Sequence, residues 1–334
     1  MDAASNQPMH DVSDLLDVLT VGEPLALFVA QQPGDLADVT SFQRFAAGAE
    51  LNVATGLARL GLRVAYLSKV GDDSFGRFVR HTVDAEGIDA RYLVTDAQHG
   101  TGFMLKGRTE DGSDPPIEYH RRGSAASHMG LADWRNLHAD GVFPARHLHL
   151  TGITPALSTT MRELVFELAR QARGTGASVS FDPNLRPRLW SSQAAMVDCV
   201  NALAAQAGGT VLPGLAEGRL LTGLQHPQDI ADFYLRLGAS QVLVKLGAQG
   251  AFFAEMHGRS ATLVAPVVAH VVDTVGAGDG FAVGVISALL EGLDLAEACA
   301  RGNAIGARVV QFPGDADGLP TRAQLMNNKD LPHG

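Results

Sequence analysis

The chain has 334 residues, of which 46% are hydrophobic, and its formal net charge is −10. This length and composition suit one large α/β domain with a small appendage and a sizeable core. The acidic balance, without a block of lysine or arginine, argues against nucleic acid or an anionic membrane as the main partner and favours a small ligand.

Neither the N-terminal segment nor the cysteines indicate export. Residues 1–17 carry acids rather than a basic segment followed by a long apolar stretch, so we expect an N-terminal tail and no signal peptide. No apolar run is long enough to span a bilayer. The two cysteines, Cys199 and Cys299, lie in apolar helical patterns, which argues against a disulfide framework or a thiolate metal site. The reducing cytoplasm is the expected compartment.

Strand-like and helix-like segments alternate along most of the chain, which is typical of a parallel sheet covered by helices. The expected strands span residues 18–29, 63–70, 147–150, 178–181, 210–212, 241–245 and 263–272. The expected helices span residues 50–60, 75–86, 159–173, 193–206, 227–237 and 281–291. This alternation predicts a doubly wound, mostly parallel sheet with helices on both faces, formed by residues 18–320, and a C-terminal tail over residues 321–334.

One stretch interrupts the alternation. Two short extended runs, 101–108 and 117–122, flank a turn-rich segment with the sequence EDGSDPP. Together with an extended run at 42–47, they predict a small β lid built from residues of about 37–47 and 100–122. Lids over α/β sheets exclude water from a reactive centre.

A glycine-rich segment, DTVGAGDG at residues 273–280, separates the last expected strand from the last expected helix. Such a turn binds anions, because unpaired backbone N–H groups and the positive end of the helix dipole point at one spot. Asp279 would lie beside a phosphoryl group, where a carboxylate is costly unless it takes a proton from an attacking hydroxyl. An ordinary glycine-rich turn is the structural alternative.

Other nucleotide, metal and hydrolase motifs are absent or incomplete. No G-x-x-x-x-G-K-[ST] string occurs, which excludes the P-loop class. Phe281 occupies the third glycine position of G-x-G-x-x-G, and this segment lies near the C-terminus, so dinucleotide binding is not expected. His147 and His149 would share one face of a strand, but no adjacent acid or cysteine completes a zinc site. The hydrolase motif G-x-S-x-G is also missing.

Residues 273–281 resemble the C-terminal signature of the ribokinase-like (PfkB) carbohydrate kinases. Residues 47–61 resemble the N-terminal signature of that family, and the sequence VGDDSFG at 70–76 continues the match. The two signatures occur in the correct order, and with the segments between them they cover nearly the whole chain. The resemblance implies a ribokinase-like fold and transfer of a phosphoryl group from ATP to a sugar, with Mg²⁺ held mainly by phosphates and water.

The resemblance also assigns roles around the phosphates. Asp279 would be the general base, and the backbone N–H groups of Gly276, Ala277 and Gly278 would form the anion hole. Fixed N–H dipoles suit a transition state whose charge is spread over three oxygens. The nucleotide would contact Thr274, Lys245, Gly247, Gly250 and Asn303. The turn that begins at Lys245 could equally be plain structure.

On the sugar side, Gly48 would allow close backbone approach and Asn52 would offer a donor and an acceptor to hydroxyl groups. A helix-surface amide is the alternative for Asn52. Residues 119–127, 150–158 and 182–190 resemble segments of family members that act on 2-keto-3-deoxygluconate.

Two arginines in these segments, Arg121 and Arg186, would match the substrate-binding arginines of those family members. A sugar acid needs a cation in its pocket, and the planar fork of arginine suits a carboxylate. Alternatively, Arg121 is a solvated lid residue and Arg186 only steadies phosphates.

Two departures from the family pattern affect the site. Met104 stands where these kinases often carry a substrate-facing tyrosine, and His120 lies near another tyrosine position. In the family's N-x-x-E segment Glu217 is kept, but Gly214 replaces the asparagine, which leaves the water-mediated metal contact of Glu217 open.

The sequence therefore predicts an ATP-dependent kinase that phosphorylates the terminal hydroxyl of 2-keto-3-deoxygluconate. A fructokinase or ribokinase-like enzyme for a neutral sugar is one alternative, and a non-catalytic sugar-binding sensor is another. The need for a monovalent cation is left open. A homodimer through the lid is expected by analogy.

Overall fold

The structure is a computed structural model that describes residues 15–109, 115–138 and 142–327. Among these residues, nine strands form one sheet in the order β13-β12-β11-β10-β9-β8-β1-β4-β5. Neighbouring strands are parallel from β5 to β11, and β12 at one edge pairs antiparallel with both β11 and β13. The strands are β1 (Leu16–Val21), β4 (Val64–Gly71), β5 (Leu93–Asp96), β8 (Ala145–Thr151), β9 (Ser178–Asp182), β10 (Thr210–Val211), β11 (Gln241–Lys245), β12 (Ala251–Glu255) and β13 (Ser260–Leu263).

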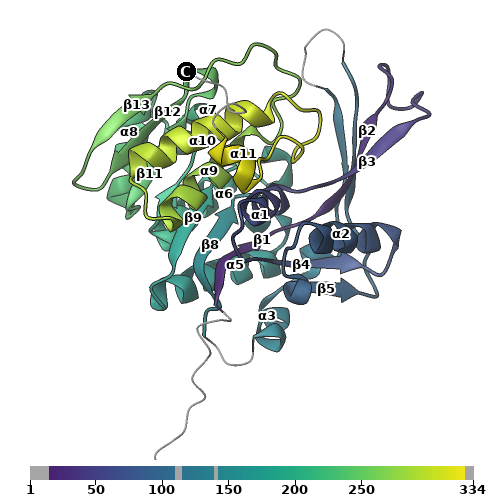
Figure 1. Ribbon diagram of the computed structural model, residues 1–334. Coiled ribbons are helices and arrows are strands. Elements are labelled where there is room, and N and C mark those ends of the chain that lie inside the picture. Colours follow the sequence, from purple (N-terminus) through teal and green to yellow (C-terminus); the bar gives the residue numbers. More distant parts are fainter. Residues whose placement is uncertain (1–14, 110–114, 139–141, 328–334) are drawn as a thin grey trace, which may run out of the picture.

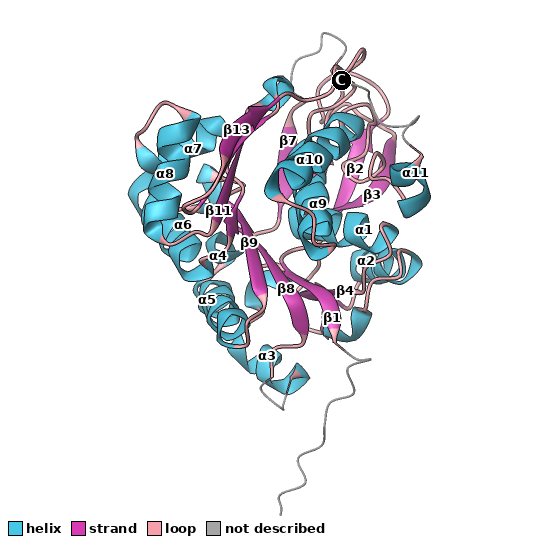
Figure 2. Cartoon of the chain, turned by 60° about the vertical axis from the view of Figure 1, so that its left-hand side comes forward, coloured by secondary structure: helices cyan, strands magenta, loops and turns pink. Residues whose placement is uncertain are grey.

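Helices cover both faces of this sheet (Figure 2). One face carries α1 (Ala49–Arg59), α2 (Ser74–Ala85), α9 (Ala277–Leu290) and α10 (Leu295–Val309). The other face carries α5 (Thr159–Gly174), α6 (Gln193–Ala207), α7 (Leu215–Thr222) and α8 (Pro227–Leu237), with α3 (Leu131–Leu137) packed on α5. Two hydrophobic cores lie on opposite sides of the sheet, which explains why the central strands are apolar on both faces. The predicted doubly wound, mostly parallel architecture is confirmed.

Local sequence accounts for several helix ends. The side chains of Asp73, Ser158 and Ser192 each accept a hydrogen bond from a backbone N–H in the first turn of α2, α5 and α6. At the other end, α6 and α8 stop at Gly208 and Gly238, which adopt the left-handed conformation that glycine tolerates.

A second, four-stranded sheet stands off the main sheet (Figure 1). It has the order β3-β2-β6-β7 and consists of β2 (Leu25–Ala30), β3 (Phe42–Ala47), β6 (Phe103–Lys106) and β7 (Ile117–His120). We call this sheet the lid. The turn-rich segment at 110–114 lies outside the described residues.

The expected single strand over residues 18–29 is wrong, because the chain leaves one sheet for the other at residues 22–24. β1 pairs in the main sheet, whereas β2 is an inner strand of the lid. A Cβ atom on Gly22 would lie 2.2 Å from the Glu50 carboxyl carbon, and Pro24 has no N–H to donate to a ladder. The continuous hydrophobic pattern did not show that β1 and β2 are two strands, so the prediction of the lid lacked β2.

The expected strand over residues 263–272 is also wrong over most of its length. β13 ends at Leu263, and residues 264–272 form a loop in which Val264 and Val267 are 78% and 82% exposed. β-branched residues favour strands only where the pleated surface can pack, and these two have no such surface.

The tails are shorter than expected where the structure describes them. Leu16 and Asp17 already belong to β1, and α11 (Arg322–Met326) lies within the expected C-terminal tail. Arg322 donates to the Leu60 carbonyl at 2.8 Å, which fastens α11 to the end of α1. Residues 1–14 and 328–334 lie outside the described residues. No helix in the described part of the chain is both long and apolar enough to cross a membrane.

Candidate active site

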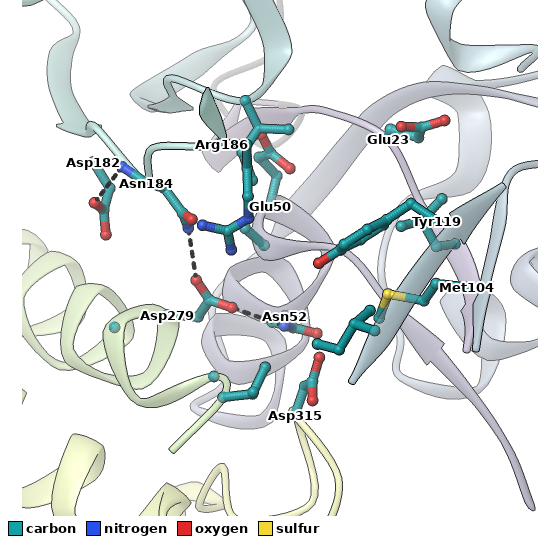
Figure 3. Close-up of a pocket in the computed structure, with 18 of the residues that line it drawn as sticks. Glu23, Glu50, Asn52, Met104, Tyr119, Asp182, Asn184, Arg186, Asp279 and Asp315 are labelled. Atoms are coloured by element: carbon teal, nitrogen blue, oxygen red, sulfur yellow. Dashed lines mark hydrogen bonds between the residues drawn. The ribbon is translucent and has the colours of Figure 1, made fainter. Parts of the chain in front are cut away.

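A cavity of about 330 Å³ lies between the lid and the carboxyl-terminal edge of the main sheet (Figure 3). Open α/β sheets bind their ligands at this edge, because strand ends and helix N-termini meet there. Most residues that the sequence indicated line the cavity: Gly48, Asn52, Met104, Arg121, Arg186, Glu217, Lys245, Thr274, Gly276, Gly278 and Asp279. Several other lining residues were not singled out as site residues from the sequence: Glu23, Glu50, Lys106, Tyr119, Asp182, Asn184 and Asp315.

Asp279 lies in the first turn of α9 and is held by two side-chain amides. Asn52 Nδ2 donates to Asp279 Oδ2 at 2.8 Å, and Asn184 Nδ2 donates to Asp279 Oδ1 at 3.4 Å (Figure 3). Asn52 is only 3% exposed, which rules out the alternative of a helix-surface amide. Asn184 has a φ of 38°, an uncommon conformation that strained functional positions adopt. The two amides fix the orientation of the carboxyl group toward the cavity.

The carboxyl group of Asp279 is suited to accept a proton near neutral pH. Burial raises its pKa from 3.8 to about 7, and the carboxylates of Asp182 and Asp315 add to the shift. The hydrogen bond from Asn52 and the charge of Lys245 act in the opposite direction. A general base is most effective when its pKa lies near the pH at which it operates.

The turn before α9 presents backbone N–H groups to the same cavity. Gly276 caps the helix with a φ of 84°, and a Cβ atom there would lie 2.4 Å from the Asp315 carbonyl oxygen. Only glycine meets both conditions. The first N–H groups of a helix have no acceptor within the helix, so that of Gly278 can bind an anion, whereas the Ala277 N–H makes a long bond of 3.4 Å to the Thr274 carbonyl. A Cβ atom on Gly278 would lie 3.3 Å from Lys245 Nζ, which places an ammonium group beside this turn.

Lys245 is paired with Asp182, since its Nζ donates to Asp182 Oδ2 at 2.6 Å. Burial alone would lower the pKa of Lys245, but the carboxylates of Asp182 and Glu217 raise it above its ordinary value. The ammonium group therefore stays charged at the anion-binding turn.

The two arginines of the cavity differ in their partners. Arg121 Nε donates to the buried carboxylate of Glu23 at 2.5 Å, and its side chain is 9% exposed. This excludes the alternative in which Arg121 is a solvated lid residue. Arg186 is half-buried at the end of the loop after β9, and its guanidinium donates only to the Leu185 carbonyl among the described residues. Figure 3 shows its side chain extending into the cavity between Asn184 and Tyr119.

Five predicted site residues are not among those that line the cavity, and one of them, Ala277, lies between Gly276 and Gly278, which do line it. The placement expected for His120 is wrong: its ring stacks on Phe103 at 4.5 Å, whereas the neighbouring Tyr119 faces the cavity. Alternation along β7 explains the difference, because successive side chains point to opposite faces. The remaining three, Gly247, Gly250 and Asn303, lie outside the cavity near the end of β13. A Cβ atom on Gly250 would lie 2.0 Å from the Leu263 carbonyl oxygen, and Asn303 Nδ2 donates to that oxygen at 3.1 Å.

Glu217 has a structural role that the sequence did not indicate. Its two carboxylate oxygens accept hydrogen bonds from the N–H groups of Leu185 and Gly214, both at 2.8 Å. The first bond steadies the loop that carries Arg186, and the second caps α7. An indirect contact between Glu217 and a metal ion stays a prediction.

The lidded cavity, the buried carboxyl group of Asp279 and the glycine-rich turn form the arrangement expected of a carbohydrate kinase. Residues 16–322 match the pfkB family carbohydrate kinase model, and the chain belongs to this family. It is a sugar kinase by membership as well as by architecture.

Comparison with known proteins gives more specific likenesses. The chain is 48% identical to a 2-dehydro-3-deoxygluconokinase of Bacillus subtilis (strain 168), over 93% of this chain and 95% of that protein. The crystal structure of a PfkB protein from Polaromonas sp. JS666 is 51% identical, has a TM-score of 0.85, and covers 93% of this chain and 99% of its own. A fructokinase double mutant from Vibrio cholerae O395, solved with fructose, ADP and potassium ion bound, is 26% identical with a TM-score of 0.79, over 94% of this chain and 99% of its own.

Proposed function

We propose that the protein transfers the γ-phosphoryl group of ATP to the terminal hydroxyl of 2-keto-3-deoxygluconate, the sugar acid also called 2-dehydro-3-deoxygluconate. The observation that supports this substrate most directly is the unpaired charge of Arg186. Among the cations that line the cavity, Lys106, Arg121 and Lys245 each have a carboxylate partner, whereas Arg186 has none within the described residues. One unpaired guanidinium in a half-buried position favours a substrate with one carboxylate. The name of the Bacillus relative supports the same substrate.

The proposed reaction uses the geometry around Asp279. The sugar hydroxyl attacks the γ-phosphorus of ATP, and Asp279 takes the hydroxyl proton as the new O–P bond forms and ADP leaves. The N–H groups of Gly276, Ala277 and Gly278 bind the charge that develops on the transferred group, and Lys245 adds a positive charge beside them. Gly48, Asn52, Met104 and Tyr119 are proposed to contact the sugar.

The nucleotide and metal assignments are further parts of this proposal. Thr274 is proposed to approach the phosphates, and the turn at Gly247 and Gly250 with Asn303 to lie beside the base. Mg²⁺ suits a site of this kind: the cavity offers few unpaired carboxylate oxygens, and this ion is commonly held by phosphates and water. When bound, it neutralises charge on the phosphates. A cytoplasmic location and a homodimer through the lid stay predictions, which fractionation and light scattering can test.

The substrate is tested by measuring ADP release with 2-keto-3-deoxygluconate, fructose, ribose and nucleosides, each with and without Mg²⁺. We expect turnover that depends on Mg²⁺ and a much higher kcat/KM for the sugar acid than for the neutral sugars. Preference for fructose or ribose would contradict the substrate assignment. Absence of turnover on every sugar would instead favour a sugar-binding sensor.

The pKa of Asp279 predicts the pH dependence of this reaction. Because the base must be deprotonated, kcat/KM for the sugar acid should rise with pH through about 7 and become level above it. The check is an initial-rate profile from pH 5.5 to 9 at saturating ATP and low sugar concentration. A profile that is flat between pH 6 and 8 would show that no group with the pKa of Asp279 controls the reaction.

A further inference from the structure

A buried cluster of three charged side chains lies next to the anion-binding turn. Lys106, on lid strand β6, is 3% exposed and forms an ion pair with Asp273, the first residue of the DTVGAGDG segment. Lys106 Nζ also lies 3.5 Å from Asp315 Oδ1. Asp315 is 6% exposed and belongs to the loop after α10. The three residues come from three separate parts of the chain and meet only because the lid is folded onto the main domain.

Each acidic residue of the cluster is connected to Gly276, Asp273 through its carboxylate and Asp315 through its backbone carbonyl. Asp273 Oδ2 pairs with Lys106, while its other oxygen, Oδ1, accepts a hydrogen bond from the Val275 N–H at 3.0 Å. This bond shapes the backbone just before Gly276. The carbonyl of Asp315 packs against Gly276 itself, where a Cβ atom would come within 2.4 Å of it. Lys106 thus holds both segments that determine the position of the turn.

The positive charge of Lys106 also compensates the two buried carboxylates of the cluster. Without the ammonium group, two carboxylates would remain buried beside a site that has to accept phosphate groups. An unpaired buried carboxylate is costly, and a negative charge close to a phosphoryl group opposes its binding. Asp315 Oδ1 has no hydrogen-bond partner among the described residues, so its neutralisation depends on this neighbouring ammonium.

We propose that Lys106 is a positioning residue that couples the lid to the anion hole. The lid strand that bears it also carries Met104, and the paired strand β7 carries Tyr119, both of which line the sugar side of the cavity. A sugar that packs against the lid therefore fixes β6, and Lys106 transmits this fixed position through Asp273 and Asp315 to Gly276. The inference rests on the proposed kinase activity.

The test compares Lys106→Met with the wild type in kcat, in KM for ATP, and in the dissociation constant of the sugar measured by calorimetry without nucleotide. We expect kcat to fall about 100-fold, because a small misplacement of reacting groups has an effect of this size. We expect sugar affinity to change less than about threefold. In Lys106→Ala, added methylammonium should restore part of kcat.

The matched control is Lys69→Met. Lys69 forms a partly buried ion pair with Asp133 at 2.9 Å outside the residues that line the cavity, so this variant loses a similar pair but should keep its kcat. If Lys106→Met fails to fold, Lys106→Met combined with Asp273→Asn removes the closer ion pair and leaves Asp315 as the one uncompensated carboxylate of the cluster. The double variant should fold and stay slow.

Several outcomes would overturn the inference. These are a kcat for Lys106→Met within about twofold of the wild type, recovery of kcat in the double variant, or a loss of sugar affinity equal to the loss of kcat. The last would indicate direct contact with the sugar. Failure of the wild type to phosphorylate any sugar would instead overturn the proposed function, so the two hypotheses can be told apart.

Discussion

Asp279→Asn is expected to reduce kcat by several orders of magnitude while sugar affinity stays nearly unchanged. The asparagine keeps the size of the side chain and can still accept the hydrogen bond from Asn52, but it cannot take a proton from the sugar hydroxyl. The effect should therefore appear in the chemical step rather than in binding. Single-turnover phosphoryl transfer and calorimetric titration with the sugar acid measure the two quantities separately.

The matched control is Asp294→Asn, the same chemical change at a helix end far from the cavity. Asp294 caps α10 and accepts a hydrogen bond from the Glu297 N–H, a role that asparagine fills about equally well. This variant should keep the kcat of the wild type. A kcat of Asp279→Asn within about tenfold of the wild type would refute the assignment of Asp279 as the base.

Stability gives independent evidence that Asp279→Asn is folded. Since the folded protein raises the pKa of Asp279 from 3.8 to about 7, the folded state binds this proton more tightly than the unfolded chain does. The stabilisation is fully present below about pH 4 and is lost as pH rises to about 7. The asparagine of Asp279→Asn does not titrate, so this variant does not lose stability in that pH range. The free energy of unfolding of the variant minus that of the wild type should therefore be higher at pH 8 than at pH 5. Denaturant titrations at the two pH values provide the measurement.

The sequence was most informative where the site is built from contiguous residues. The segment DTVGAGDG contains the helix start, the glycine conformation and the acid within eight positions, so the glycine-rich turn and the position of Asp279 at the cavity could be predicted together. The alternation of strands and helices likewise predicted the main sheet, because parallel strands buried on both faces form continuous apolar runs.

Residues that enter the site from distant segments were not predictable in the same way. Asp182 ends the buried parallel strand β9 and Asn184 follows it, a position that does indicate a ligand-binding edge, but nothing local shows that Asn184 reaches Asp279. Lys106 and Asp315 are 209 positions apart and become partners only through the packing of the lid. The prediction that His120 faces the cavity failed because a shift of one residue in the register of a short edge strand exchanges its two faces, and here Tyr119 is on the cavity side.

Arg186→Ala is expected to raise KM for 2-keto-3-deoxygluconate about 10- to 100-fold with a smaller effect on kcat, because a charged hydrogen-bonded pair contributes about 1.5–3 kcal/mol. KM for a neutral sugar should hardly change, since such a substrate has no carboxylate for the guanidinium to bind. The neutral comparison is fructose, or the carboxamide of the same sugar acid if fructose is turned over too slowly. The readout is the ratio of kcat/KM values for the acid and the neutral sugar, measured in both proteins.

Arg188→Ala is the matched control, because Arg188 lies two residues further along the same loop but is exposed. It should leave the ratio unchanged. If Arg186→Ala reduces kcat/KM equally for acid and neutral sugars, or raises KM for ATP instead, the guanidinium acts on the phosphates. The sugar carboxylate would then need another cation, and Arg121 is poorly placed to supply one while Glu23 neutralises it. The selectivity ratio of Arg186→Ala therefore decides between a kinase for a sugar acid and one for a neutral sugar.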